Sequence, residues 1–151
     1  MSSKAATDTT GYRLLIGQQF PNVEVLDLDG NVTKTSQILG QGRVFLFLEP
    51  TCSYCVKIID RWRDQFEKKL MSPEEVAAIV PASVEAAQAY QRLQSLPFAV
   101  YVDTGLIFMN RFQVTDFPLQ LVVGKSGTIH DYNFQVDRQI FADQIRRQFE
   151  K

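Results

Sequence analysis

The chain has 151 residues, enough for one domain with a buried core, and 45% hydrophobic against 22% charged residues is the composition of a folded protein. Its 16 basic and 17 acidic residues give a net charge of -1, which argues against a nucleic-acid partner, because phosphate backbones are bound by strongly basic surfaces. Apolar runs such as residues 44–48 are far shorter than the roughly 20 residues of a membrane-spanning helix, so we expect no membrane span.

The N-terminal residues 1–15 are mostly small and polar and show no hydrophobic period. They predict a flexible N-terminal segment ahead of a single domain at 16–151. The segment lacks the apolar region of a secretory signal. The chain is therefore either a cytoplasmic protein or the mature part of an exported one.

The first half of the domain contains strand and turn patterns. Near-alternating apolar residues at 22–28 predict a strand, and the Asp-Gly pair at 29–30 predicts a hairpin turn that returns at 32–34. Residues 35–40 predict a short capped helical turn that a glycine ends. The continuous apolar run at 43–48 predicts a central strand that is covered on both faces.

The second half alternates helical and strand patterns. Residues 76–80 fit either a helix that a cap at 72–75 begins or a buried strand, and we favour the strand. In chain order, the second half is expected to contain an amphipathic helix at 55–70, a strand at 76–80, a helix at 86–96, a strand at 98–102, a helical turn at 106–112, strands at 119–123 and 128–134 around a turn at 124–127, and a C-terminal helix at 140–149. This order of elements indicates an α/β fold.

Both cysteines lie within four residues, Cys52-Ser53-Tyr54-Cys55, where the buried strand gives way to a helix. Two cysteines are too few for a secreted scaffold held by disulfides, and the spacing indicates redox chemistry instead. Positions i and i+3 of a helical turn place the Cα atoms roughly 5–6 Å apart, within the range of a disulfide. The unpaired N–H groups and the dipole at the helix N-terminus favour negative charge on the first sulfur. We therefore predict Cys52 as the catalytic nucleophile and Cys55 as the catalytic resolving thiol, with no cofactor.

The sequence VFLFLEPTCSYC at 44–55 resembles the strand and active-site motif of the thioredoxin superfamily. Residues 114–118 (VTDFP), followed by 119–123, look like the cis-proline loop and the strand after it. The inserted strand and helix at 76–96 and the opening residues 16–32 are similar to TlpA/ResA-like thiol-disulfide oxidoreductases, bacterial proteins of an AhpC/redoxin-type branch. The resemblance implies a three-layer α/β/α fold with a central mixed sheet, an N-terminal β-hairpin and an inserted β-α element.

The resemblance also implies a substrate site and partners. Pro118 is expected to be cis and to face the cysteine pair, with the backbone of Phe117 pairing with a bound substrate segment. Ser53 and Tyr54 are expected to contact the same substrate. The implied reaction is the reduction or exchange of protein disulfides by a monomer, with a membrane thiol-electron carrier as a candidate partner. The implied compartment is the periplasm, with the cytoplasm as the alternative.

Two carboxylates of related proteins are missing from this chain. Leu46 stands where thioredoxin has its buried acid, and Ile58 stands where ResA-like members carry an acid. Glu49 is the nearest acid in sequence and is the candidate proton relay. Its alternative role is that of a solvated residue at the end of a strand.

Two other functions are found on the same fold. A peroxiredoxin-like thiol peroxidase needs a hydroxyl residue three positions before its cysteine, and that position holds Glu49. A metal-delivery module needs a longer cysteine spacing and a histidine near the proline loop, whereas the single histidine, His130, is expected on a hairpin strand. Structural zinc needs four ligands, and the chain has no second C-x-x-C motif. We therefore predict no metal site.

Overall fold

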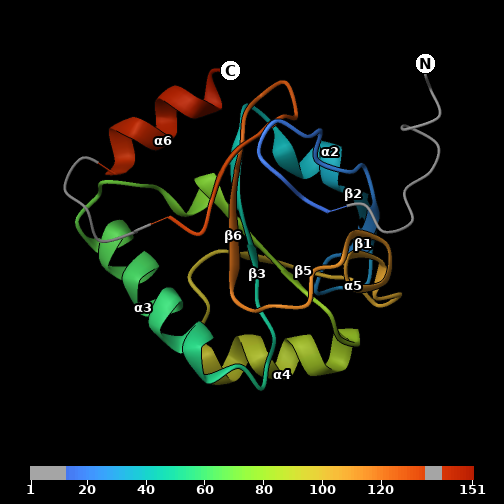
Figure 1. Ribbon diagram of the computed structural model, residues 1–151. Coiled ribbons are helices and arrows are strands. Elements are labelled where there is room, and N and C mark those ends of the chain that lie inside the picture. Colours follow the sequence, from blue (N-terminus) through green and yellow to red (C-terminus); the bar gives the residue numbers. More distant parts are fainter. Residues whose placement is uncertain (1–12, 135–140) are drawn as a thin grey trace, which may run out of the picture.

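The computed structural model describes residues 13–134 and 141–151, and within these ranges the chain forms a seven-stranded mixed sheet with helices on both faces (Figure 1). The strand order across the sheet is β2-β1-β5-β4-β3-β6-β7. The strands are β1 (Glu24–Leu26), β2 (Val32–Lys34), β3 (Arg43–Phe47), β4 (Val76–Val80), β5 (Ala99–Val102), β6 (Leu119–Val123) and β7 (Ile129–Tyr132). The helices are α2 (Thr35–Leu39), α3 (Ser53–Glu67), the 3₁₀ helix η1 (Pro73–Glu75), α4 (Val84–Gln94), α5 (Ile107–Phe112) and α6 (Phe141–Phe149).

The three central strands β3, β4 and β5 are parallel and are linked by helices in the order β3-α3-β4-α4-β5. Such crossovers are right-handed, so α3 and α4 cover the same face of the sheet. The flanking strands β6 and β1 are antiparallel to β3 and β5, and β7 and β2 extend the sheet on either side. Figure 1 shows α3 and α6 on one side of the sheet and α2 and α5 on the other. The predicted three-layer α/β/α fold is therefore confirmed, with its N-terminal hairpin.

Strand β3 and the residue after it are buried from both sides, as the apolar run predicts. Val44, Leu46 and Leu48 belong to the core cluster beneath α3, α4 and α6. Phe45 and Phe47 belong to the second core cluster, beneath α2 and α5. All five side chains are at most 1% exposed. Because successive residues of a strand point to opposite faces, one short segment supports both layers of helices.

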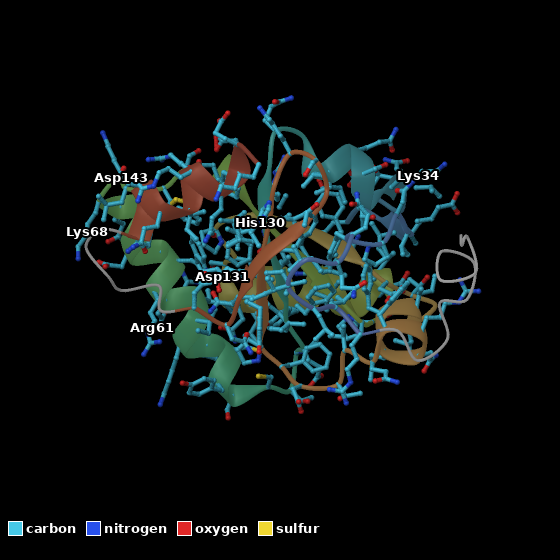
Figure 2. All side chains as sticks on the ribbon, turned by 45° about the horizontal axis from the view of Figure 1, so that its top comes forward. Lys34, Arg61, Lys68, His130, Asp131 and Asp143 are labelled. Atoms are coloured by element: carbon cyan, nitrogen blue, oxygen red, sulfur yellow. The ribbon has the colours of Figure 1, made fainter. Side chains whose placement is uncertain are left out.

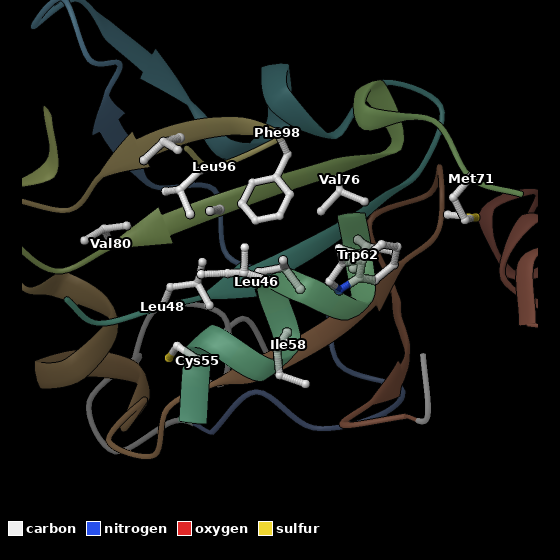
Figure 3. Packing of buried hydrophobic residues seen from close by; sticks show 14 of the residues in the cluster. Leu46, Leu48, Cys55, Ile58, Trp62, Met71, Val76, Val80, Leu96 and Phe98 are labelled. Carbon is white, nitrogen blue, oxygen red and sulfur yellow. The ribbon is translucent and has the colours of Figure 1, made fainter. Parts of the chain in front are cut away.

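Helix α3 has one buried face and one solvent-exposed face. Arg61 and Lys68 extend away from the sheet (Figure 2). Ile58, Ile59 and Trp62 are at most 4% exposed and belong to one core cluster with residues of β3 and β4. Figure 3 shows Ile58 and Trp62 in this cluster. The predicted amphipathic helix is confirmed, and its apolar stripe holds the helix on the sheet.

The ends of α3 differ from the predicted 55–70. The helix begins at Ser53, because Cys52 caps its first turn. It ends at Glu67, because Lys69 takes a left-handed backbone conformation with a φ of 58°. Each end of the helix is set by the backbone conformation of one residue, which hydrophobic periodicity does not predict.

Other elements are found near their predicted places. The segment at 76–80 is a strand, β4, paired with β3 in parallel, and the cap at 72–75 begins only the 3₁₀ helix η1. The last hairpin strand ends at Tyr132, because Asn133 has a φ of 49°. The predicted start of the last helix at Ile140 lies outside the described residues. No helix in the described ranges combines the length and apolar character that a membrane span requires.

The packed part of the chain starts earlier than the predicted domain. Most of the predicted flexible segment, residues 1–12, lies outside the described residues. Leu14, however, is 9% exposed and belongs to the same core cluster as Phe20 and Phe45. Residues just before 16 therefore contribute to the core.

Candidate active site

Cys52 lies in the connection between β3 and α3, where it is the N-cap of the helix. Its backbone is extended, with a φ of -81° and a ψ of 108°, and its sulfur accepts a hydrogen bond from the backbone N–H of Cys55 at 3.1 Å. The first N–H groups of a helix have no partner within the helix. The Cys52 sulfur thus takes the place of an N-cap oxygen and lies at the positive end of the helix dipole. This geometry confirms that the cysteine pair opens the helix.

Cys55 lies one turn into α3, on the side of the helix that faces the sheet. Its side chain is 0% exposed, whereas that of Cys52 is half-buried, and both are free thiols. Figure 3 shows Cys55 and Ile58 beneath Leu48 and Leu46. Burial raises the pKa of the Cys55 thiol to about 12, and hydrogen bonding with the Cys52 side chain contributes to the same rise. The two thiols therefore differ in access, and the buried one is held protonated.

The proline loop approaches Cys52 from the other side. The Phe117–Pro118 peptide bond is cis, as the resemblance implies. The Cys52 thiol donates to the carbonyl oxygen of Phe117 at 3.5 Å. Strand β6 follows this loop and pairs with β3 in the register Leu119 to Phe47, which sets residues 117 and 118 beside the connection that ends in Cys52. Sheet pairing thus brings together two segments 65 residues apart.

Glu49 lies near both cysteines, but its carboxylate is already bonded. It accepts hydrogen bonds from the backbone N–H of Thr51 at 3.0 Å and from the Thr51 hydroxyl. Its backbone carbonyl accepts the N–H of Cys52 at 2.9 Å. The negative charge of Glu49 also contributes to the raised pKa of Cys55. The carboxylate therefore influences the buried thiol while bonding to its own loop.

The surface around Cys52 is formed by the first turn of α3. Ser53 is exposed, and Tyr54 is 53% exposed, with the Lys57 ammonium 5.4 Å from the centre of its ring. Val56 is also exposed. Both residues between the cysteines are therefore accessible to a partner.

The structure adds one side chain that the sequence did not single out. Leu46 and Ile58, at the positions of the missing acids, are buried with Cys55. Tyr90 of α4 belongs to the same cluster, and its hydroxyl is buried without a hydrogen-bond partner among the described residues. In the sequence Tyr90 is one residue of an amphipathic helix. The signal that could have found it is the order β3-α3-β4-α4, which sets both helices on one face.

His130 lies on β7 next to Asp131 (Figure 2). It adjoins Gly124, the residue after β6. The adjoining end of β6 pairs with Arg43 at the start of β3, whereas Cys52 follows the other end of β3. In the part of the chain that the structure describes, no three His, Cys, Asp or Glu side chains gather as a metal site would require. The structure therefore sets His130, which was not predicted as a site residue, apart from the cysteine pair.

Comparison with known proteins agrees with this geometry. The model of the AhpC/TSA family matches residues 16–136. Thiol-disulfide oxidoreductase ResA of Bacillus cereus is 24% identical over 139 residues, which cover 91% of this chain and 76% of that protein.

Two solved structures show the same fold. The thioredoxin domain of a thiol-disulfide oxidoreductase from Bacteroides vulgatus superposes with a TM-score of 0.71 at 14% identity, covering 89% of this chain and 97% of that one. An exposed lipoprotein thioredoxin of Streptococcus pneumoniae superposes with a TM-score of 0.60 at 18% identity, covering 84% of this chain and 99% of that one. The described fold is therefore thioredoxin-like.

Proposed function

The chain belongs to the AhpC/TSA family and is a TlpA/ResA-like thiol-disulfide oxidoreductase, and from this premise we propose that it reduces or exchanges protein disulfides through Cys52 and Cys55. The observation that carries the proposal is the contrast between two thiols one helical turn apart. Cys52 is half-buried at the mouth of α3, and Cys55 is 0% exposed. A partner can reach the Cys52 sulfur, and the Cys55 sulfur can then attack the Cys52 sulfur.

The reaction starts when the Cys52 thiolate attacks one sulfur of the partner's disulfide. The partner's S–S bond breaks, its second sulfur leaves as a thiolate that takes up a proton, and a mixed disulfide joins the partner to Cys52. Cys55 then loses its proton and attacks the Cys52 sulfur. The partner leaves as a dithiol, the Cys52–Cys55 disulfide forms, and two electrons have passed to the partner.

The environment of each sulfur supports this order of events. At neutral pH a pKa of about 12 keeps Cys55 as a thiol in the resting protein. Because thiolates attack and thiols do not, Cys55 is silent until the mixed disulfide places an electrophilic sulfur beside it. The order also protects the buried thiol from unrelated disulfides.

The substrate segment is proposed to lie between the proline loop and the start of α3. In this proposal the Phe117 carbonyl, 3.5 Å from the Cys52 sulfur, pairs with the substrate backbone beside Pro118. Ser53 and Tyr54 border the same sulfur and are exposed. An aromatic ring at such a position supplies contact area with little loss of side-chain entropy.

The physiological setting is part of the same proposal. We place the protein in the periplasm as a monomer that receives electrons from a membrane thiol carrier. One similar structure is described as an exposed lipoprotein thioredoxin, which supports a location outside the cytoplasm. To test this setting, cells are fractionated and the thiols of each fraction are trapped with acid. A periplasmic protein would be recovered with the periplasmic fraction. Recovery with the cytoplasm would contradict it.

The activity itself is tested by three assays on the reduced protein. We expect it to accelerate the reduction of insulin by dithiothreitol, and to leave the decay of hydrogen peroxide and the binding of copper(I) near control levels. The equilibrium of the Cys52–Cys55 pair with glutathione then gives its reduction potential. A value near that of thioredoxin indicates a reductase, and a much more oxidising one indicates a disulfide donor. Rapid peroxide consumption without insulin reduction would overturn the proposal.

A further inference from the structure

The hydroxyl of Tyr90 is a buried polar group that the reaction described above does not use. The side chain is 5% exposed, and its oxygen has no hydrogen-bond partner among the residues that the structure describes. A buried hydroxyl without a partner costs free energy, because it gives up its bonds to water and gains none.

Tyr90 lies close to the cysteine pair. It belongs to the same buried cluster as Leu48 and Cys55, and Cys52 packs against that cluster. Helices α3 and α4 follow neighbouring parallel strands, and the Arg63 guanidinium of α3 reaches the carbonyl of Ser95, just past the end of α4, at 3.2 Å. Tyr90 and Cys55 therefore belong to one buried cluster on the face of the sheet that α3 and α4 cover.

The electrostatic neighbours of Tyr90 agree with this placement. Burial raises the pKa of the Tyr90 hydroxyl, and the negative charges of Cys55, Cys52 and Glu49 raise it further, in that order. The hydroxyl thus stays protonated while the thiols react, and it is available as a neutral hydrogen-bond donor. An acceptor that becomes negatively charged nearby is the partner that such a donor binds most strongly.

The resolving step creates that acceptor. Cys55 must lose its proton in a pocket formed by apolar residues such as Leu48 and Ile58, where a thiolate is poorly solvated. Leu46 and Ile58 belong to the same buried cluster as Cys55, and their side chains carry no polar atom. Without a donor, the buried thiolate would form only rarely.

We infer that the Tyr90 hydroxyl donates a hydrogen bond to the Cys55 sulfur as that sulfur becomes a thiolate, an inference that rests on the proposed function. The hydroxyl has no partner among the described residues of the resting protein, so this bond is gained only as the step proceeds. An interaction gained on the way to the transition state lowers the barrier. The Cys55 proton passes to the departing sulfur of the substrate, and Tyr90 keeps its own proton.

Glu49 is less suited to this task than Tyr90. Its carboxylate already accepts two hydrogen bonds from Thr51, and its negative charge disfavours a second negative charge on Cys55. The Tyr90 hydroxyl is neutral, and no described residue bonds to it. Stabilisation of the buried thiolate is therefore assigned to Tyr90.

Tyr90→Phe tests the inference, because it removes only the hydroxyl. The reduced protein is mixed with dithionitrobenzoate, a small aromatic disulfide that releases one coloured thiolate when Cys52 attacks and a second when Cys55 resolves. We expect the second phase to slow by roughly tenfold or more and the first phase to be unchanged. The midpoint of thermal unfolding should not fall, since no described residue bonds to the hydroxyl in the resting state.

Tyr101→Phe is the matched control, because Tyr101 packs against the core cluster on the opposite face of the sheet. It should leave both phases unchanged. A second phase in Tyr90→Phe that equals that of the wild type would overturn the inference, and so would equal slowing of both phases. A wild-type protein that shows no second phase would instead contradict the proposed function itself.

Discussion

Cys52 and Cys55 are one helical turn apart, yet their surroundings are opposite. Cys52 caps α3 at the surface and has the Phe117 carbonyl 3.5 Å from its sulfur. Cys55 is 0% exposed against Leu48 and Ile58, and burial raises its pKa to about 12. Two identical thiols thus differ in exposure because of what packs around them. In the proposed reaction this difference sets the order in which the two sulfurs react.

The largest effect should follow from removing the accessible sulfur. Cys52→Ser is expected to lower the rate of insulin reduction by at least about 1,000-fold, because a serine hydroxyl is not ionised at neutral pH. The initial rate of insulin precipitation with dithiothreitol measures this. Retention of a tenth of the wild-type rate would show that Cys55 can attack substrates directly, and the contrast between the two thiols would be lost.

Removing the buried sulfur should stop turnover in a different way. Cys55→Ser keeps the accessible nucleophile, so it should react once with a disulfide and remain joined to its partner. Mass spectrometry of the unreduced protein after incubation with oxidised peptide should show the mixed disulfide in most molecules. The roles would be reversed if the mixed disulfide did not form in Cys55→Ser and if Cys55 of the wild type were alkylated before Cys52.

The buried thiol also affects how the stability of the reduced protein depends on pH. The folded pKa of Cys55, about 12, lies above its unfolded value of about 8.5, so the unfolded chain loses this proton first as the pH rises. The contribution is fully present below pH about 8.5 and is lost as the pH rises toward 12. We expect the free energy of unfolding to fall by up to about 1.4 kcal/mol per pH unit above pH about 9.

Urea unfolding of the reduced wild type and of Cys55→Ala at two alkaline pH values isolates this contribution. The variant lacks the titrating thiol, so its stability should change less between the two values. Equal changes in both proteins would mean that the Cys55 thiol is not buried as described.

The smallest effect is expected at Glu49. If its carboxylate moves protons at the site, Glu49→Gln should slow insulin reduction by about 3- to 10-fold. The matched control is Glu67→Gln, the same change at the exposed far end of α3. Equal rates for both variants would leave Glu49 as a residue that holds its own loop through Thr51.

Local patterns in the sequence were enough for much of the fold and part of the site. An uninterrupted run of apolar, β-favouring residues predicted the doubly covered strand at 43–48, and periodicity predicted α3. The C-x-x-C spacing after that strand predicted the cysteine pair at the helix mouth. The cis geometry of Pro118 followed from the resemblance to the thioredoxin superfamily. The strand, the helix and the cysteine spacing depend on residues close together in the sequence, and the covalent chain restricts how such residues can be arranged.

Contacts between distant segments were not predictable in the same way. The 3.5 Å approach of Phe117 to Cys52 depends on the register between β3 and β6, and the burial of Trp62 beside Gln120, which accepts its indole N–H at 3.0 Å, depends on the same pairing. Periodicity assigns a residue to a face but does not tell which residue of another element it meets.

The two cysteines show which features of the site follow from local sequence and which depend on contacts between distant segments. The C-x-x-C spacing after a buried strand was enough to place the two thiols one helical turn apart, because helix geometry sets the distance between positions i and i+3. The folded structure places Cys55 beneath Leu48, in one cluster with a Tyr90 hydroxyl to which no described residue bonds, while Cys52 stays accessible. Burial and its effect on a pKa arise from atoms that the folded sheet and helices bring together, and no local pattern specifies them.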